Sequence, residues 1–342
     1  MVRQISSPNA HLAICVPTYN RPEALDRCLS MLVEQCAPLG VAICVSDNAS
    51  SFDAEGLVER HRASYPWIRF SRNSENLGMG ANFLKVVELC EARYAWLFSD
   101  DDAMAHGAVA EMLGLCAEPS CAELIISNRE YMKGDMTPDR GVVSEPILAD
   151  ETVKGGGALL RRAAVRHYTF IGCLCFQVDL WRRVRPERFL GLPYFPHLSI
   201  VASFMSDPTR RARLLAKPLV RVRGGGFSWE RRAGAVWFKD LATCVRAAEG
   251  YSNEQRRAAL RQAWRDINPY TLWLICKHGQ RGAALASWRD SRSDHAAMGA
   301  WGLWAFNGIA LSGALLTPGW VFGAARLAYR ASRMGRGASS SR

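Results

Sequence analysis

The sequence predicts an α/β protein: a mostly parallel β-sheet flanked by helices, followed by a helical C-terminal extension. In the first third of the chain, short apolar runs alternate with amphipathic stretches, which is typical of strands and helices that alternate along a parallel sheet. Polar residues follow three of the apolar runs, at residues 18–21, 47–48 and 100–102. Because the carboxyl ends of parallel strands meet at one edge of a sheet, we expect these residues to converge on one crevice.

The elements of the first third follow from composition and spacing. Residues 12–16 are apolar and predict a buried strand closed by Pro17. Pro22 favours a helix start, because a backbone N–H in the first turn has no partner within the helix and proline lacks that N–H. This helix should reach about residue 36. The next predicted elements are a strand at 41–45, a helix at 53–64, a strand at 68–71 and a helix opened by 76–82. An aromatic, apolar run from residue 94 predicts the strand that ends at the acidic residues 100–102.

The pattern continues less regularly after residue 102. The predicted elements are a helix at 105–116, a strand at 124–127, a helix after glycines 155–157, a strand at 170–178, a helix within 191–205, a strand at 213–222 and helices from 235 to 288. We therefore expect an α/β domain over residues 1–232, a helical extension over 233–295 and an apolar, basic tail over 296–342.

Net charge and cysteine content limit the partners and the compartment. The formal net charge is +11, which favours anionic partners, and with no RNA or DNA motif present we expect no nucleic-acid partner. The 11 cysteines form neither a Cys-x-x-Cys pair nor a zinc-type spacing, so we expect free thiols in a reducing compartment. The first ten residues do not have the pattern of a signal peptide, so we expect the protein to stay in the cytoplasm or on the cytoplasmic side of a membrane.

Three adjacent carboxylates repel one another unless they are solvated or neutralised by a cation. Asp100, Asp101 and Asp102 follow a strand directly, where open α/β sheets bind their ligands, so a bound cation is favoured. Hard oxygen ligands suit Mg²⁺ or Mn²⁺ held together with substrate phosphates. A solvated acidic turn remains the alternative.

Four motifs resemble those of the family 2 glycosyltransferases, which use a nucleotide-diphospho-sugar and adopt the GT-A fold. They lie, in the family's order and spacing, at residues 16–22, 45–50, 76–82 and 99–102. Beyond residue 102 the resemblance is looser: segments 170–172 and 227–229 are similar to bacterial abequosyltransferase-like enzymes, which build O-antigen-type polysaccharides.

The resemblance implies a set of nucleotide-binding residues. Pro17, Thr18 and Tyr19 would lie against the base and ribose, and Asp47 would accept a hydrogen bond from the base. The other implied nucleotide-binding residues are Asn20, Arg21, Asn76, Gly78, Asn82 and Asp100. Arg231, on a glycine-rich loop, is a further candidate that could close over the diphosphate, with a solvated basic loop as the alternative.

The same resemblance implies a metal site but leaves its ligands and the catalytic base open. Asp100, Asp101 and Asp102 occupy the family's Asp-x-Asp position, either with Asp101 as direct ligand or with Asp100 and Asp102. Inverting relatives usually carry a Glu-Asp pair whose aspartate acts as the catalytic base. This chain has no such dipeptide. His197 occupies the equivalent place and could be the base or could simply pack there. Asp179 and Asp207 are the alternative carboxylates.

The tail from residue 296 to 325 is uncharged and contains tryptophans. This uncharged stretch is also long enough to cross a bilayer. Glycines and the pair Pro318-Gly319 interrupt it, which favours two short interfacial helices. Arg326, Arg330, Arg333 and Arg336 follow and suit anionic headgroups. We expect peripheral or re-entrant attachment to an anionic membrane surface, at the cytoplasmic face of the bacterial inner membrane. A tail packed on the protein's own core is the alternative.

Together these features predict a metal-dependent glycosyltransferase. It would move a sugar from a nucleotide-diphospho-sugar to a hydroxyl of a lipid-linked glycan. This reaction would belong to cell-surface polysaccharide or O-antigen synthesis. One alternative is a nucleotidyltransferase, which is disfavoured because residues 18–21 contain no glycine. The other is a catalytically inactive, membrane-associated nucleotide-binding protein.

Overall fold

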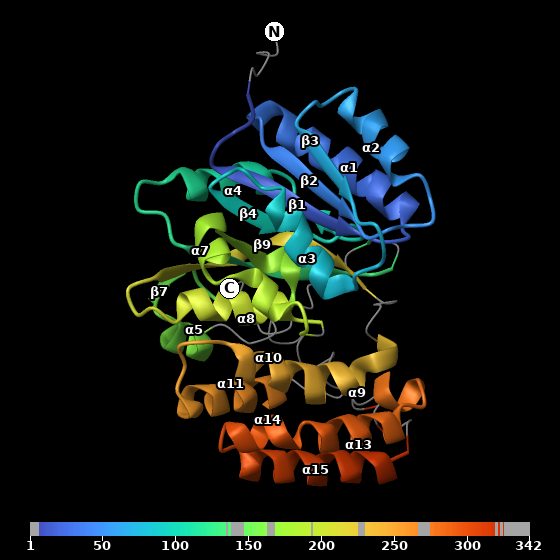
Figure 1. Ribbon diagram of the computed structural model, residues 1–342, viewed down its shortest axis with the longest axis vertical. Coiled ribbons are helices and arrows are strands. Elements are labelled where there is room, and N and C mark those ends of the chain that lie inside the picture. Colours follow the sequence, from blue (N-terminus) through green and yellow to red (C-terminus); the bar gives the residue numbers. More distant parts are fainter. Residues whose placement is uncertain are drawn as a thin grey trace, which may run out of the picture.

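A computed structural model describes residues 7–134, 136–137, 147–162, 168–192, 194–224, 230–265, 274–318, 321 and 324. It confirms the α/β class. A nine-stranded sheet runs in the order β3-β2-β1-β4-β8-β6-β9-β5, with β7 paired to β9. Helices cover both faces of this sheet, and a further stack of helices lies below it (Figure 1).

The first four strands confirm the predicted alternation of strands and helices. In chain order the elements are β1 (Leu12–Thr18), α1 (Pro22–Cys36), β2 (Ala42–Asp47), α2 (Ala54–Arg62), β3 (Ile68–Arg72), α3 (Met79–Glu88) and β4 (Tyr94–Leu97). β1 pairs in parallel with β2 and β4, and β2 pairs in parallel with β3. Pro22 stands at the start of α1, and the side chain of Asp53 caps α2 by accepting a bond from Gly56 N. The loops that leave these four strands therefore meet at one edge.

The second half of the sheet corrects the prediction of a mostly parallel sheet. Its elements are β5 (Ala103–Met104), α4 (Ala108–Ala117), β6 (Leu124–Met132), β7 (Glu151–Lys154), α5 (Gly156–Arg162), β8 (Leu174–Gln177), α7 (Val178–Arg183), α8 (Pro196–Met205) and β9 (Arg211–Arg223). β8 lies between β4 and β6 and is antiparallel to both. β5 and β7 are antiparallel to β9, and β6 is parallel to β9, so the sheet is mixed.

Two hydrophobic cores lie on opposite faces of the sheet. Alternate residues of β1 point to different cores: Ala13 and Cys15 to one, Leu12 and Ile14 to the other. α3 and α8 contribute to the first core, and α1, α2 and α4 contribute to the second. Because buried side chains fix both faces, the register of the central strands is fixed as well.

The helical stack below the sheet is made of the C-terminal third of the chain. Its elements are α9 (Ala233–Ala235), the π-helix η5 (Val236–Asp240), α10 (Leu241–Ala247), α11 (Asn253–Arg265), α13 (Arg281–Asp290), α14 (Arg292–Ala297) and α15 (Trp301–Leu316). α10 contacts α8, and α13 contacts α9, so the stack is continuous with the body of the protein. α15 is the outermost helix, at the bottom of Figure 1.

Among the described residues of the tail, Trp301–Leu316 form helix α15, which packs on α13 and α14. Gly319 and the arginines at 326, 330, 333 and 336 lie outside the described residues. In the part of the chain that the structure describes, no helix combines the length and the apolar character needed to cross a membrane. The expected membrane attachment remains a prediction, as do the three domain boundaries.

Three short elements were missed by the sequence analysis: β5, β7 and α7. β5 has two residues, and β7 has one buried residue, Val153, so neither has an apolar pattern long enough to detect. The strand expected at 170–178 begins as a 3₁₀ turn, η2 (Ile171–Cys173), which shortens it to β8. At this turn a Cβ on Gly172 would stand 2.8 Å from the ring of Phe170.

The contact between α9 and α13 gives a test of the stack. A Cβ on Gly234 would lie 2.6 Å from the Cβ of Ala284, so the two helices can approach only because residue 234 is glycine. We expect Gly234→Val to destabilise the protein by roughly 1–3 kcal/mol or more through overpacking, measured by urea unfolding. Gly114→Ala is the control: nothing lies within 4 Å of its Cβ, and we expect a gain of about 0.5–1 kcal/mol. Equal effects would contradict this description of the stack.

Candidate functional site

The polar loops after β1, β2 and β4 meet at one edge of the sheet, which confirms the predicted convergence. Thr18, the last residue of β1, donates a hydrogen bond of 2.6 Å from Oγ1 to Asp100 Oδ2 in the loop after β4. The backbone N–H of Asn48, just beyond β2, donates to the carbonyl oxygen of Thr18 at 3.0 Å. Three loops distant in sequence are thus joined by direct bonds.

One arginine bridges two carboxylates of the acidic cluster. Arg21 Nη1 donates to Asp100 Oδ1 and to Asp101 Oδ2, each at 2.9 Å. The side chain of Asp100 is nearly covered, whereas that of Asp101 is 30% exposed and that of Arg21 is 37% exposed. Asp101 also accepts from Ser99 Oγ. Asp101 is therefore the carboxylate of this pair that is open to an incoming ligand.

Burial dominates the acidity of the cluster. It raises the pKa of Asp100, although Arg21 and the hydrogen bond from Thr18 act in the opposite direction. It raises the pKa of Asp102 well above its usual range, and the neighbouring Asp101 adds to this. Burial alone would lower the pKa of Arg21, but Asp100 and Asp101 raise it overall. Because burial disfavours the charged forms of Asp100 and Asp102, a further cation bound at the cluster would stabilise those charged forms.

Asp102 is held apart from the other two acids. Its Oδ1 accepts from the backbone N–H of Arg223, at the end of β9, at 3.0 Å. The buried guanidinium of Arg129, on β6, lowers its pKa, opposing burial. Arg129 itself donates from Nε to Tyr131 Oη at 3.1 Å and lies over the ring of Phe170. Asp102 therefore ties the acidic loop to the other half of the sheet.

These positions test whether a metal ion fits. Within the described ranges, no three His, Cys, Asp or Glu side chains are arranged so that they could hold an ion. The expectation that Asp100, Asp101 and Asp102 together form the site is therefore not supported, because Asp102 is turned to Arg223 and Asp100 to Thr18. A hard cation held by one or two carboxylates and by substrate phosphates does fit the oxygen donors present, with Asp101 the accessible one.

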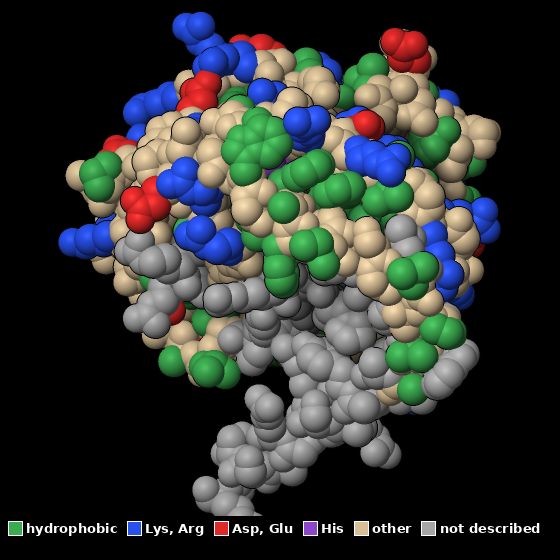
Figure 2. Space-filling model, turned by 90° about the horizontal axis from the view of Figure 1, so that it is seen from below, with side chains coloured by type: hydrophobic (Ala, Val, Ile, Leu, Met, Phe, Trp, Pro, Cys, Tyr) green, Lys and Arg blue, Asp and Glu red, His purple; other side chains and the backbone are tan. Residues whose placement is uncertain are grey.

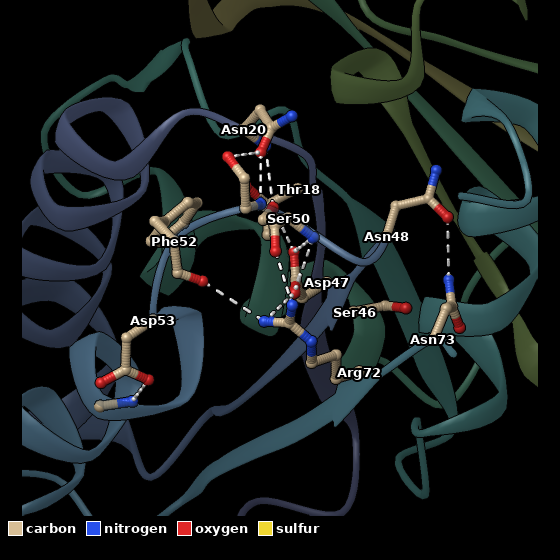
Figure 3. Close-up of polar contacts among 12 residues, drawn as sticks. Thr18, Asn20, Ser46, Asp47, Asn48, Ser50, Phe52, Asp53, Arg72 and Asn73 are labelled. Carbon is tan, nitrogen blue, oxygen red and sulfur yellow. Dashed lines mark hydrogen bonds and ion pairs between the residues drawn. The ribbon is translucent and has the colours of Figure 1, made fainter. Parts of the chain in front are cut away.

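The loop after β2 is organised around a buried carboxylate (Figure 3). Asp47 is fully covered, and its oxygens accept from Ser50 N at 3.2 Å, from Ser50 Oγ and from Arg72 Nη1 at 3.1 Å. Arg72, at the end of β3, also donates to the carbonyl oxygens of Ser50 and Phe52. Asp47 is thus engaged by the protein itself, and its hydrogen bond with a nucleotide base remains a prediction.

Asn20 fixes the loop after β1 against the loop after β2. Its backbone is left-handed, with φ at 51°, a conformation that asparagine tolerates better than most residues. Its N–H donates to Ser50 Oγ at 2.8 Å, and its Oδ1 accepts from Ser51 N at 2.7 Å. Asn20 is thus engaged by the protein itself, and a nucleotide contact by it remains a prediction.

Four asparagines form a network behind the start of α3. Asn82 is buried and joins Ser46, Asn73 and the carbonyl oxygen of Thr18, so its amide positions the strand ends rather than facing a ligand. Asn48 bonds to Asn73 and Asn76, and Asn76 Oδ1 also accepts from Gly78 N. Gly78 has φ at 85°, where a side chain would be strained. The network presets the turn that begins α3.

The remaining predicted nucleotide residues differ in accessibility. Pro17 and Thr18 lie inside the sheet, whereas Tyr19 is exposed, as are Leu77 and Met79 at the start of α3. Exposed apolar side chains at this edge suit a flat base or ribose. Arg231 is exposed in the short turn η4 (Glu230–Arg232), and the glycine-rich loop before it, 225–229, lies outside the described residues. Its contact with a diphosphate remains a prediction.

His197 does not suit the role of catalytic base. It lies in the first turn of α8, fully buried, with its ring edge-on to Phe83 at 5.3 Å and to Phe195 at 6.1 Å between centroids. Burial lowers its pKa to about 4, although the backbone of Thr169 and Tyr168 opposes the shift. A buried imidazole of low basicity can neither reach an acceptor hydroxyl nor hold its proton near neutral pH. The packing alternative describes it better.

Asp179 and Asp207 lie at the wrong edge of the sheet. β8 is antiparallel to β4 and pairs Gln177 with Tyr94, so Asp179, just beyond it, lies beside the start of β4, opposite the acidic loop. Its side chain is 81% exposed. Asp207 precedes β9, whose residue Ala212 pairs with Leu124 at the start of β6, again at the far edge. Hydrogen bonds from Thr209 lower the pKa of Asp207, which weakens it further as a base.

Sequence reasoning missed Arg72, Arg129 and the backbone of Arg223. Arg72 could have been found by the rule that found Asp47, because it ends the neighbouring parallel strand. Arg129 and Arg223 could not, since they reach the acidic loop only through the pairing of β6 with β9, a contact between distant segments.

Comparison with known proteins agrees with this geometry. Residues 13–166 match the glycosyl transferase family 2 profile. The abequosyltransferase RfbV of Salmonella typhimurium (strain LT2) is 29% identical over 242 residues, 66% of this chain and 70% of that protein. The chondroitin synthase of Escherichia coli is 28% identical over 98 residues, 29% of this chain and 14% of that protein. The predicted resemblance is confirmed.

Solved structures show the same fold at low identity. S. aureus TarS 1–349 in complex with UDP-GlcNAc is similar with a TM-score of 0.58 at 14% identity, covering 83% of this chain and 81% of that one. Its complex with UDP gives 0.52 at 12% identity, with 84% and 89% covered. The expected GT-A-type sheet and helices are confirmed, and the membrane-associating character of the extension remains a prediction.

The buried His197 predicts a pH effect on stability. An unfolded histidine titrates near 6.5, above the folded value of about 4, so protons favour unfolding and stability is lost as the pH falls through this interval. Urea unfolding measures the free energy of unfolding at about pH 7 and at about pH 4.5. Between these values we expect it to fall by roughly 2–3 kcal/mol less in His197→Gln than in the parent. His106→Gln, at an exposed histidine, should behave like the parent. An unchanged pH dependence in the His197 variant would show that the ring is not buried neutral.

Proposed function

From the premise that the chain is a glycosyltransferase with a family 2 region at residues 13–166, we propose that it moves a sugar from a nucleotide-diphospho-sugar to a hydroxyl of a glycan. The observation that carries this proposal is the joined edge of the sheet, where Thr18, Arg21 and Asp100 connect two loops beside the exposed Tyr19. The TarS complexes with UDP and UDP-GlcNAc support a nucleotide-sugar donor.

The side chains at this edge have separate roles toward the donor. Arg72, held by Asp47 and by two carbonyl oxygens, offers a donor group to the base, while Tyr19 offers a flat surface. Arg21 is partly exposed and bridges Asp100 and Asp101, so a rotation of its side chain would carry its charge to the diphosphate. Negative charge grows on that diphosphate as the sugar leaves, and a fixed positive group there lowers the barrier.

We further propose that Mg²⁺ or Mn²⁺ assists, held by Asp101, with Asp100 as a second oxygen donor. When bound, such an ion stabilises the negative charge of the leaving nucleoside diphosphate. Arg21 occupies the space between the two carboxylates, so it must move when a cation enters. Asp102 supports the loop through Arg223 and is not part of this set.

The acceptor and the setting are proposed from the chemistry of the relatives. The similarity to an abequosyltransferase supports a glycan acceptor in cell-surface polysaccharide or O-antigen synthesis. We propose that this glycan is lipid-linked and that the enzyme works at the cytoplasmic face of the bacterial inner membrane. The uncharged helix α15 and the net charge of +11 support a membrane-surface location.

Nucleoside diphosphate binding should depend on a divalent ion through Asp101. We expect Asp101→Asn to weaken diphosphate affinity in Mn²⁺ by about tenfold or more, because a neutral amide loses the charge that attracts the ion, and to leave the affinity in chelator unchanged. Calorimetry with UDP, GDP and CDP, each with and without Mn²⁺, measures both and identifies the preferred base.

The matched control is Asp179→Asn, which removes the same charge from an exposed aspartate at the opposite edge. It should leave binding and turnover unchanged. Equal affinity with Mn²⁺ and with chelator in the parent protein would remove the metal from the mechanism. Binding of no nucleoside diphosphate under either condition would contradict the proposed donor.

A further inference from the structure

The outer face of α15 exposes large apolar side chains to solvent. Phe306 is 67% exposed, Ile309 is 74% exposed and Leu316 is 88% exposed, and Trp301 is also exposed. Phe306, Ile309 and Leu316 are spaced by three and seven residues, so they lie on one side of the helix. None of the 16 residues of α15 is charged. Large apolar side chains exposed together on one side of a helix are typical of an interaction surface.

The opposite side of α15 is already occupied by the protein. Leu311 is buried in a cluster with Phe238 and Ala284, and a Cβ on Gly308 would overlap the ring of Trp288. The rings of Trp288 and Trp304 stack with centroids 4.4 Å apart, and each indole N–H donates to the other residue's carbonyl oxygen. Because α15 packs on α13 and α14, its outer face is the one that the described part of the chain leaves open to a partner.

The charge around this face is positive. Residues 274–318 contain four basic residues, Lys277, Arg281, Arg289 and Arg292, and two acidic ones, Asp290 and Asp294, a balance of +2. Both acids form ion pairs with cations from the layer above, Asp290 with Lys239 and Asp294 with Arg246.

Aromatic and basic side chains meet at one end of α15. The guanidinium of Arg292 lies over the rings of Trp301 and Trp304, at 5.3 and 5.9 Å from their centroids. Seen from below, hydrophobic side chains gather across this end of the molecule and Lys and Arg side chains lie around them (Figure 2). Apolar side chains with tryptophan and arginine at their margin match the boundary zone of a bilayer, where aromatic rings and cations meet lipid headgroups.

We propose that α15 lies flat on an anionic lipid bilayer, with Phe306, Ile309 and Leu316 inserted below the headgroups and the basic residues of α13 and α14 against lipid phosphates. At about 1.5 Å per residue, its 16 residues are about 24 Å long, shorter than a hydrocarbon core of about 30 Å. The proposal rests on the proposed function, because it names the surface on which a transferase for lipid-linked glycans would work.

Vesicle flotation of the full chain tests this proposal. We expect the parent protein to float with phosphatidylglycerol-rich vesicles and to stay behind with pure phosphatidylcholine. The double variant Phe306→Asp, Ile309→Asp should lose about tenfold or more of its binding, because two carboxylates would enter the headgroup zone. Leu148→Asp is the matched control: this leucine is 87% exposed, lies outside α15 and should change nothing.

Two further measurements make the outcomes decisive. Each variant is melted with and without UDP and Mn²⁺, which separates loss of lipid binding from unfolding and from loss of the donor site. A double variant that is folded and still floats like the parent overturns the proposal, as does a parent that never floats. A parent that sediments as a dimer, with the double variant a monomer, also overturns it, because a second copy then covers α15.

Discussion

The burial of carboxylates at the edge of the sheet is the constraint on which the rest of the site depends. Asp47, Asp100 and Asp102 are all buried where strands end, and each has an arginine from a different element: Arg72 beside Asp47, Arg21 beside Asp100 and Arg129 near Asp102. A buried carboxylate is tolerated only with such compensation. These arginines come from β3, from the loop after β1 and from β6, so the compensation also joins the edge together.

The first half of this edge could be predicted from the sequence because every step there is local. Pro22 begins α1, parallel strands alternate with helices, and Asp47 and Asp100 follow strands directly. The direction of β8 could not be predicted, because an apolar run of four residues is the same pattern in either orientation. That one direction also explains the wrong placement of Asp179, which a parallel β8 would have brought to the acidic edge.

The surroundings of individual side chains were the second feature that could not be predicted from the sequence. His197 has the sequence position of a catalytic residue, and its two aromatic neighbours come from α3 and from the residue before α8. Only the packing of these helices shows that the ring is enclosed. The same packing links α3, which begins at the edge with the polar loops, to the helical stack. A Cβ on Gly80 in α3 would stand 2.9 Å from Pro196 in α8. The ring of Phe195, just before α8, lies 6.3 Å from the ring of Trp237 in the stack, centroid to centroid.

The order of the helical layers sets the distance between α8, under the sheet, and α15, the outermost helix of the stack. α8 contacts α10, α10 contacts α14 and α14 contacts α15, and these layers follow one another down the long axis (Figure 1). Three helix-to-helix steps of about 8–10 Å place α15 roughly 25 Å from α8. With α15 on lipid as proposed, these helical layers would stand between the bilayer and the sheet, so the sugar would be transferred at a distance from the membrane surface.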